Sequence, residues 1–132
     1  MISQTTEYGL RAVVFLAEHG VGKTTEEISK ATQIPAAYLS KVLQQLARGN
    51  IVQSQRGLGG GFTLRKAAAE LSVLEVVNAV DPIRRIRECP LGLDAHKSRL
   101  CALHKRLDEA SALVEKAFAE SSIADLISDS ES

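Results

Sequence analysis

Both cysteines of this chain, Cys89 and Cys101, fall within residues 89–104, together with two of its three histidines. Cysteine and histidine gathered in a short polar segment are typical of a soft-metal site, because thiolate and imidazole are the ligands that such metals prefer. Cys101 and His104 are three residues apart at the expected start of a helix, so both side chains could reach one centre. Two cysteines are too few for an all-thiolate iron–sulfur cluster, so His96, His104 or a carboxylate would have to complete it.

Basic residues near these cysteines favour thiolate over thiol; among them are Arg84, Arg85, Arg87 and Lys97. The cysteines could instead be inert thiols, or they could form a disulfide. A permanent disulfide is disfavoured in a reducing cytoplasm. We expect a cytoplasmic protein, because no run approaches ~18 apolar residues and no basic segment leads into an apolar one at the N-terminus.

The charge is distributed unevenly along the 132 residues, although the formal net charge is zero. Residues 28–69 contain no acid, and the six basic residues among them are Lys30, Lys41, Arg48, Arg56, Arg65 and Lys66. Such a stretch is the usual electrostatic footprint of nucleic-acid binding. A solvated face that happens to lack acids would give the same pattern, so motifs must decide between the two.

Two helices joined by a short turn are predicted where this basic stretch begins. Thr24 and Glu27 have the spacing of a capping box, which starts the first helix. Pro35 is expected to open the second helix, where its missing N–H costs nothing. The second helix has an apolar stripe for burial, formed by Leu39, Val42, Leu43 and Leu46. The pattern is typical of a helix-turn-helix.

A glycine-rich hairpin is predicted directly after the second helix. Two β-prone runs, 51–55 and 62–65, flank the sequence Arg-Gly-Leu-Gly-Gly-Gly-Phe. Arg56 at the start of this loop could enter a narrow minor groove, where the potential is most negative. Gly59 and Gly60 would let the backbone approach DNA closely. Helix-turn-helix followed by hairpin describes a winged helix.

The outer face of the second helix suits a major groove. Tyr38 and Ser40 could bond to phosphates, Lys41 could reach guanine or phosphate, and Gln44 could pair with adenine. A merely solvated polar face is the alternative, and the adjoining wing favours the DNA-binding interpretation.

Residues 20–25 invite a different interpretation, because Gly-Val-Gly-Lys-Thr-Thr resembles the end of a phosphate-binding P-loop. The full motif needs glycine at the position of Ala17 and a buried strand before the loop. The preceding residues have helical periodicity instead, so a loop followed by a capping box is the better prediction.

The remaining elements complete a mainly α fold with a small β-hairpin. A first helix runs from a cap at Ser3 to about residue 18, and a capping box of Ser72 and Glu75 starts another that stops before Pro82. A long helix over 100–120 is expected to form a dimer through Leu103, Leu107, Ala110, Val114 and Ala117. The expected organisation is a DNA-binding domain at 1–82, a Cys/His cluster-binding loop at 83–104, the dimerisation helix at 100–120 and an acidic tail at 121–132.

The chain resembles the Rrf2 family of bacterial winged-helix transcription regulators, the group of IscR- and NsrR-like proteins. The matching segments occur in order at residues 8–12, 34–39, 43–46, 56–62 and 75–81. The wing string is the most specific of them. The resemblance implies a homodimer, in which the long helix of each subunit crosses its partner, and binding to operators near promoters.

The resemblance also implies a ligand set for a cluster. Cys89 and Cys101 match the first and third of three cysteines that cluster-binding members usually carry, while Ala95 stands where the middle one is expected. The chain therefore departs from the family's usual ligand set. A [2Fe-2S] cluster would be held by both cysteines and by two further ligands from Glu7, His96 and His104. Glu7 would come from the opposite subunit.

We therefore predict a sequence-specific, double-stranded DNA-binding repressor that recognises a palindromic operator as a homodimer. An iron–sulfur cluster would sense redox state, nitric oxide or iron–sulfur status, and no enzyme chemistry is expected. The alternatives are a cluster-free regulator that uses thiols or another metal, a metal-carrying redox protein, and a small nucleotide-binding module.

Overall fold

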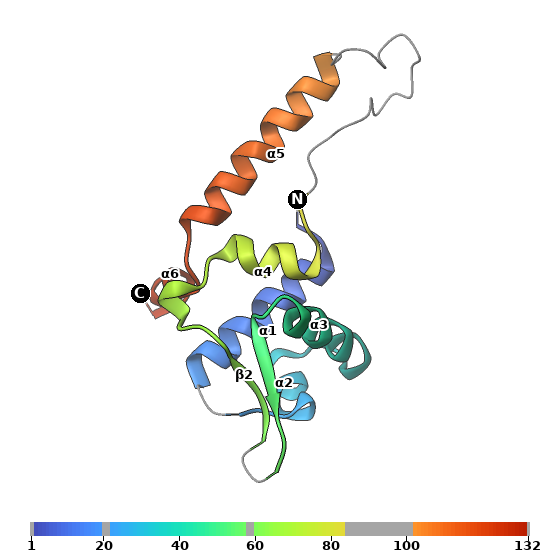
Figure 1. Cartoon of the computed structure of the whole chain (residues 1–132), viewed down its shortest axis with the longest axis vertical. Helices are drawn as coiled ribbons and strands as arrows, with labels where there is room; N and C mark the ends of the chain where they lie inside the picture. The colour runs from blue at the N-terminus through green and yellow to red at the C-terminus, as the bar shows by residue number, and fades with distance from the viewer. Residues whose placement is uncertain (1, 20–21, 58–59, 84–101, 132) are drawn as a thin grey trace.

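A computed structural model describes residues 2–19, 22–57, 60–83 and 102–131 (Figure 1). Its elements, in chain order, are α1 (Gln4–His19), α2 (Thr25–Thr32), α3 (Ala36–Arg48), β1 (Val52–Gln55), β2 (Gly61–Leu64), the 3-10 turn η1 (Ala68–Glu70), α4 (Val73–Val80), α5 (Ala102–Glu120) and α6 (Ile123–Glu131). The predicted fold class, mainly α with a winged helix-turn-helix and a long C-terminal helix, is confirmed. Within the described residues, no helix is both long and apolar enough to cross a membrane.

The starts of α1, α2 and α4 are set by side-chain caps that the sequence predicts. The Thr6 N–H donates to Ser3 Oγ at 3.1 Å at the start of α1. Thr24 and Glu27 form a reciprocal capping box at α2, as Ser72 and Glu75 do at α4. Each box satisfies backbone N–H groups that the first helical turn leaves without partners.

The wing is a two-stranded antiparallel hairpin with a short third segment beside it. Val52 pairs with Leu64 at its base, and Gln55 pairs with Gly61 near its tip. Lys23 forms a further bridge with Phe62, in which the Lys23 N–H donates to Phe62 O at 3.1 Å and the Phe62 N–H donates to Lys23 O at 2.7 Å. This bridge was not predicted from the sequence.

The same bridge argues against the P-loop interpretation of residues 20–25. The segment before this loop is helix α1 and not a buried strand. Lys23 is held by the wing backbone, and its ammonium group lies 3.9 Å from the Glu27 carboxylate. The only sheet in the described part of the chain is the antiparallel hairpin, so a parallel-sheet nucleotide site has no framework here.

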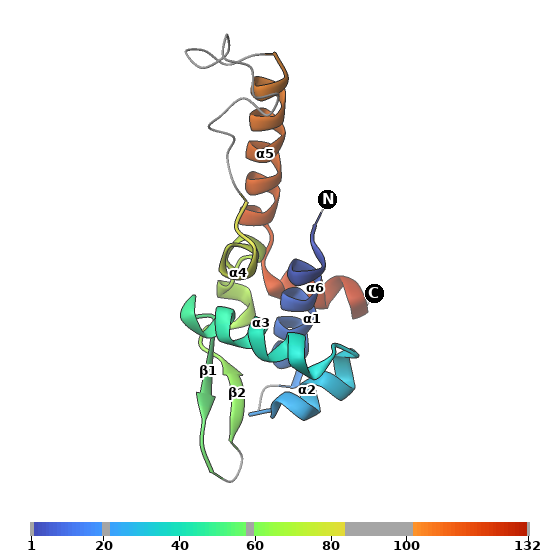
Figure 2. The same ribbon diagram turned by 90° about the vertical axis from the view of Figure 1, so that its right-hand side faces the viewer.

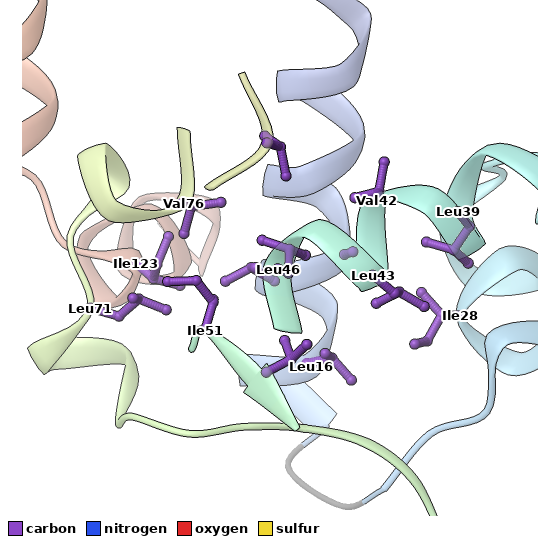
Figure 3. Close-up of a cluster of buried hydrophobic side chains, with 14 of the residues drawn as sticks. Leu16, Ile28, Leu39, Val42, Leu43, Leu46, Ile51, Leu71, Val76 and Ile123 are labelled. Atoms are coloured by element: carbon purple, nitrogen blue, oxygen red, sulfur yellow. The ribbon is translucent and has the colours of Figure 1, made fainter. Parts of the chain in front are cut away.

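The hydrophobic core lies where α1, α2, α3, α4 and β1 meet (Figure 3). Its fully enclosed aliphatic side chains include Ile28, Leu43, Leu46, Leu71 and Val76. Helix α1 buries Ala12 and Leu16, whereas Leu10, Val14 and Ala17 are only half-buried.

The C-terminal segment, expected to be a frayed acidic tail, forms helix α6 over Ile123–Glu131. The Ile123 N–H donates to Leu71 O at 2.8 Å, and the Val73 N–H donates to Ser121 O at 2.8 Å. The Ile123 side chain is fully buried in the core. The acidic composition of this segment gave no sign of Ile123, which joins α6 to the winged-helix body together with the partly buried Leu126 and Ile127.

Helix α5 differs from the other helices because it projects away from the body, with the wing at the opposite end of the molecule (Figure 2). His104 is its one buried residue among those described, and the predicted apolar stripe is not covered. Leu103 is 40% exposed and Leu107 is 39% exposed, while Leu113 nearby is 69% exposed.

Candidate nucleic-acid interface

Helix α3 separates its apolar and polar residues onto opposite faces. Leu39, Val42, Leu43 and Leu46 are buried against the core. The predicted contact residues Tyr38, Ser40, Lys41 and Gln44 are all exposed, and Tyr38 has 60% of its surface free. Ala36 and Ala37 are exposed beside them, so small side chains flank the polar ones and would permit close approach to a groove. The helix therefore presents the surface that the sequence predicts.

Most cations of the basic stretch are available for a ligand. Within the described residues, Lys41, Arg48, Arg56 and Arg65 take part in no ion pair. Lys66 is the exception, because its ammonium group lies 2.6 Å from Glu75 Oε1. This hydrogen bond, followed by that from the Ser72 backbone N–H, holds the pKa of Glu75 below its ordinary value. Lys66 therefore stabilises the start of α4.

The backbone geometry of the wing loop itself requires glycine at two positions. The Gly60 N–H donates to Gly57 O at 2.8 Å, and a Cβ at Gly60 would lie 2.6 Å from Gln55 O. Gly57 has φ 92°, which favours glycine. The turn thus explains Gly60 without DNA, and Gly59 lies outside the described residues. Arg56 is exposed at the end of β1, as its predicted role requires.

A contact between α1 and α3 supports the start of the exposed face. The rings of Tyr8 and Tyr38 lie 6.4 Å apart at 50°, and the Arg11 guanidinium lies 5.6 Å from the centre of the Tyr8 ring. Arg11 also donates to Thr32 O at the end of α2, at 3.5 Å. This chain of contacts links all three helices. The sequence contained both tyrosines, but nothing in their spacing indicated that they meet.

The candidate metal ligands are described only in part. Cys89, His96 and Cys101 lie outside the described residues. His104 is buried, with 2% of its surface exposed, whereas Glu7 is exposed on α1. No group of three or more metal-ligating side chains occurs among the residues that the structure describes.

Glu7 and His104 are not brought together within one chain. Thr6 is buried toward α4 and α5, where it lines a groove with Leu107. Glu7 follows it by one residue, which is about 100° around the helix, and lines a different surface with Leu10 and Arg11.

The exposed face of α3 and the hairpin beside it define a winged helix-turn-helix protein of the transcription-regulator class. The chain belongs to the Rrf2 family: the sequence model of that family, described as an iron-dependent transcriptional regulator, matches residues 2–129. This match spans α1 to α5 and most of α6, and it confirms the resemblance in the sequence.

Relatives found by sequence similarity are named as transcriptional regulators. An HTH-type transcriptional regulator homologue from Aquifex aeolicus is 27% identical over 131 residues, which cover 96% of this chain and 91% of the relative. A Mycobacterium tuberculosis homologue of the same type is 33% identical over 94 residues, covering 69% of this chain and 58% of its own length. Both matches agree with a transcription-regulator assignment.

Solved structures show the same fold. IscR of T. potens aligns with 98% of this chain and 88% of its own, at a TM-score of 0.79 and 20% identity. CymR of B. subtilis, titled the global cysteine regulator, aligns with 97% of this chain and 96% of its own, at a TM-score of 0.77 and 19% identity. At these identities the similarity establishes the architecture and leaves the signal open.

Proposed function

We propose that this regulator binds duplex DNA sequence-specifically through the exposed face of α3 and the wing, and that it acts as a repressor. The observation that carries the proposal is the exposed face of α3, which carries no acid and, among the described residues, no ion pair, together with an exposed wing arginine. Tyr38, Ser40, Lys41 and Gln44 supply groups for bases and phosphates, and Arg56 supplies a cation for a minor groove. Family membership supports this assignment independently.

We further propose that the DNA-binding species is a two-fold homodimer that recognises a palindromic operator. The apolar stripe of α5 supports this, because Leu103 and Leu107 keep about two-fifths of their surface exposed in the single chain. Burial of such a stripe against a second α5 would remove apolar surface from water. Two-fold symmetry would also present two copies of α3 to two half-sites.

An iron–sulfur cluster is the signal receptor that we propose, held by Cys89 and Cys101. The described residues are compatible with a mixed ligand set. His104 places an imidazole in the first turn of α5, close in sequence to Cys101. Glu7 is exposed on α1, where a second subunit could meet it. His96 is the remaining candidate.

Such a cluster would supply a redox-sensitive and nitric-oxide-sensitive group. Bound between the subunits, it would link the position of α5 to that of the two reading helices. The difference in DNA affinity between cluster states would be the coupling free energy. A cluster-free regulator that uses its thiols or another metal is the second candidate. The chain shares its fold with CymR, which is titled a cysteine regulator, and this similarity is compatible with that candidate.

Two experiments test these proposals. Titration of promoter fragments from the source genome should reveal at least one duplex that binds far more tightly than mixed-sequence DNA. No specific binding in any cofactor state would contradict the DNA-binding proposal. Anaerobic reconstitution should give visible absorbance and bound iron that Cys89→Ala and Cys101→Ala lose. Iron uptake equal to that of the double variant would contradict the cluster.

A third outcome separates the metal-carrying alternative from the regulator. A coloured, iron-loaded protein with no affinity for any duplex would favour a redox carrier. Iron binding with DNA affinity independent of cluster state would leave the regulator intact and remove only the switch.

A further inference from the structure

A polar groove lies between the first turns of α1 and the outer face of α3. Gln4, Thr5 and Tyr8 line it from α1. Tyr38, Lys41 and Arg48 line it from α3. Gln4, Thr5 and Tyr8 are not among the DNA contacts predicted from the sequence, and Arg48 was predicted only as part of the basic stretch, so the groove extends the predicted contact surface onto a second helix.

The groove offers hydrogen-bond donors and positive charge. Its hydroxyl groups come from Thr5 and the two tyrosines, and its cations, Lys41 and Arg48, make no ion pair within the described part of the chain. Asp81 is the one acid that lines it, at the end near α4. Two cations and several neutral donors against one carboxylate suit a ligand with a single negative charge and several acceptor oxygens.

The position of the groove next to the exposed face of α3 indicates which ligand it would meet. Lys41 and Gln44 belong both to the groove and to the exposed face of α3, so the two surfaces are continuous. When a reading helix enters the major groove, the elements that flank it meet the sugar-phosphate strand. Contacts to that strand fix the register of a protein on the duplex.

The Tyr8 ring is well placed to act as a fixed donor. It contacts the Tyr38 ring of α3 and the Arg11 guanidinium of α1. Arg11 also donates a hydrogen bond to the end of α2. The Tyr8 ring is therefore linked to α1, α2 and α3. A donor held in this way loses little conformational entropy on binding.

We propose that this groove binds a phosphodiester of the DNA backbone, with Tyr8, Thr5 and Arg48 as its principal contacts. The inference rests on the proposed DNA-binding function and adds a clamp that positions α3 without reading sequence. It predicts that the groove contributes equally to specific and non-specific duplexes.

The test compares Tyr8→Phe, Arg48→Gln and the matched charge control Lys116→Gln, which removes an exposed cation from α5. Each protein is titrated with a mixed-sequence duplex, and with a promoter fragment that the wild type selects, at several salt concentrations. Arg48→Gln should weaken both duplexes roughly tenfold and reduce the salt slope by about 0.9. Tyr8→Phe, which keeps the ring, should weaken both by roughly three- to tenfold with an unchanged slope. Lys116→Gln should match the wild type.

The possible results are distinguishable. If the wild type binds neither duplex, the proposed function itself fails. If it binds and both groove variants match it, the clamp is refuted while the regulator stands. A loss confined to the promoter fragment would also overturn the clamp, because it would assign Tyr8 and Arg48 to sequence reading. Thermal melting of each variant verifies that folding is intact.

A final arm separates the DNA backbone from a free anion. Inorganic phosphate is added at constant ionic strength, with chloride as the reference. Under the proposal it competes no better than chloride, because one isolated phosphate lacks the rest of the duplex. Saturable binding of inorganic phosphate that Arg48→Gln abolishes and DNA does not displace would overturn the assignment.

Discussion

The winged-helix body and helix α5 bury their apolar residues in different ways. The body encloses aliphatic side chains from six elements, and several of them, such as Leu43 and Leu46, have no exposed surface. Helix α5 is the longest helix described, yet its leucines remain between 39% and 69% exposed. The body therefore covers its apolar residues within one chain, whereas α5 leaves large apolar side chains exposed in the part of the chain that the structure describes.

This difference separates what the sequence encodes for folding from what it encodes for association. Apolar residues that repeat along a helix predict burial, but they do not specify whether the covering surface belongs to the same chain. In α3 the stripe meets α1 and α4, while in α5 Leu103 and Leu107 keep about two-fifths of their surface exposed and Val114 is half-buried. Equivalent substitutions should therefore reduce folding stability in the winged-helix body and association between chains at α5.

The largest expected effect comes from truncating the same residue type in the two regions. Leu43→Ala removes a fully buried side chain of α3, so the free energy of unfolding should fall by about 2–5 kcal/mol. Leu113→Ala in α5 should change it by less than about 0.5 kcal/mol. Denaturant titration at a protein concentration that keeps the chain monomeric gives both values. Similar losses for the two variants would erase the distinction between the regions.

Charge on the α5 stripe should affect association and leave the body intact. The double variant Leu103→Glu, Leu107→Glu should weaken the dimer at least tenfold, since burial of unpaired carboxylates in an apolar interface is costly. Sedimentation should move from about twice the 14.2 kDa chain mass to the mass of one chain. Lys105→Glu, on the polar side of the same helix, is the control. A wild type that is monomeric at micromolar concentration would contradict the predicted dimer.

The body was largely predictable because its signals are local. The capping boxes at Thr24 and Ser72, the stripe of α3 and the glycine-rich turn each depend on residues a few positions apart. The structure contains all of them. The pairings between distant segments were not predicted. They are the bridge from Lys23 to Phe62 and the backbone hydrogen bond from Ile123 to Leu71.

The candidate site divides along the same line. Exposure of Tyr38, Lys41 and Gln44 followed from the helical period once the buried stripe was known. The contact between Tyr8 and Tyr38 could not be predicted, because it depends on how α1 crosses α3. A Cβ at Gly9 would lie 3.1 Å from Val80, so this glycine contributes to that close packing of α1 against α4. The predicted ligands Cys89, His96 and Cys101 stay predictions.

The wing offers a test in which binding changes while stability does not. Arg56→Ala should weaken operator binding by roughly 1–3 kcal/mol if the side chain makes a specific contact. Because Arg56 is exposed and outside any ion pair of the described residues, the melting temperature should stay within error of the wild type. Arg106→Ala on α5 is a control for the loss of an exposed arginine. Equal operator affinity for wild type and Arg56→Ala would remove the wing from the interface.

The smallest expected effect lies at the start of α4, where Glu75 caps the helix and pairs with Lys66. The Lys66 hydrogen bond and then the Ser72 N–H lower the pKa of Glu75 from its ordinary value of 4.5. A carboxyl group whose pKa is lower in the folded state stabilises the fold above its unfolded-state pKa, and this contribution is lost as pH falls through the folded-state pKa. Glu75→Gln should therefore reduce the free energy of unfolding at pH 7 by less than about 1 kcal/mol, since the side chain is 38% exposed and the pair is screened by solvent. Unfolding curves of the two proteins should converge below pH 4.5, whereas a constant difference across that range would show that the charge of Glu75 does not stabilise α4.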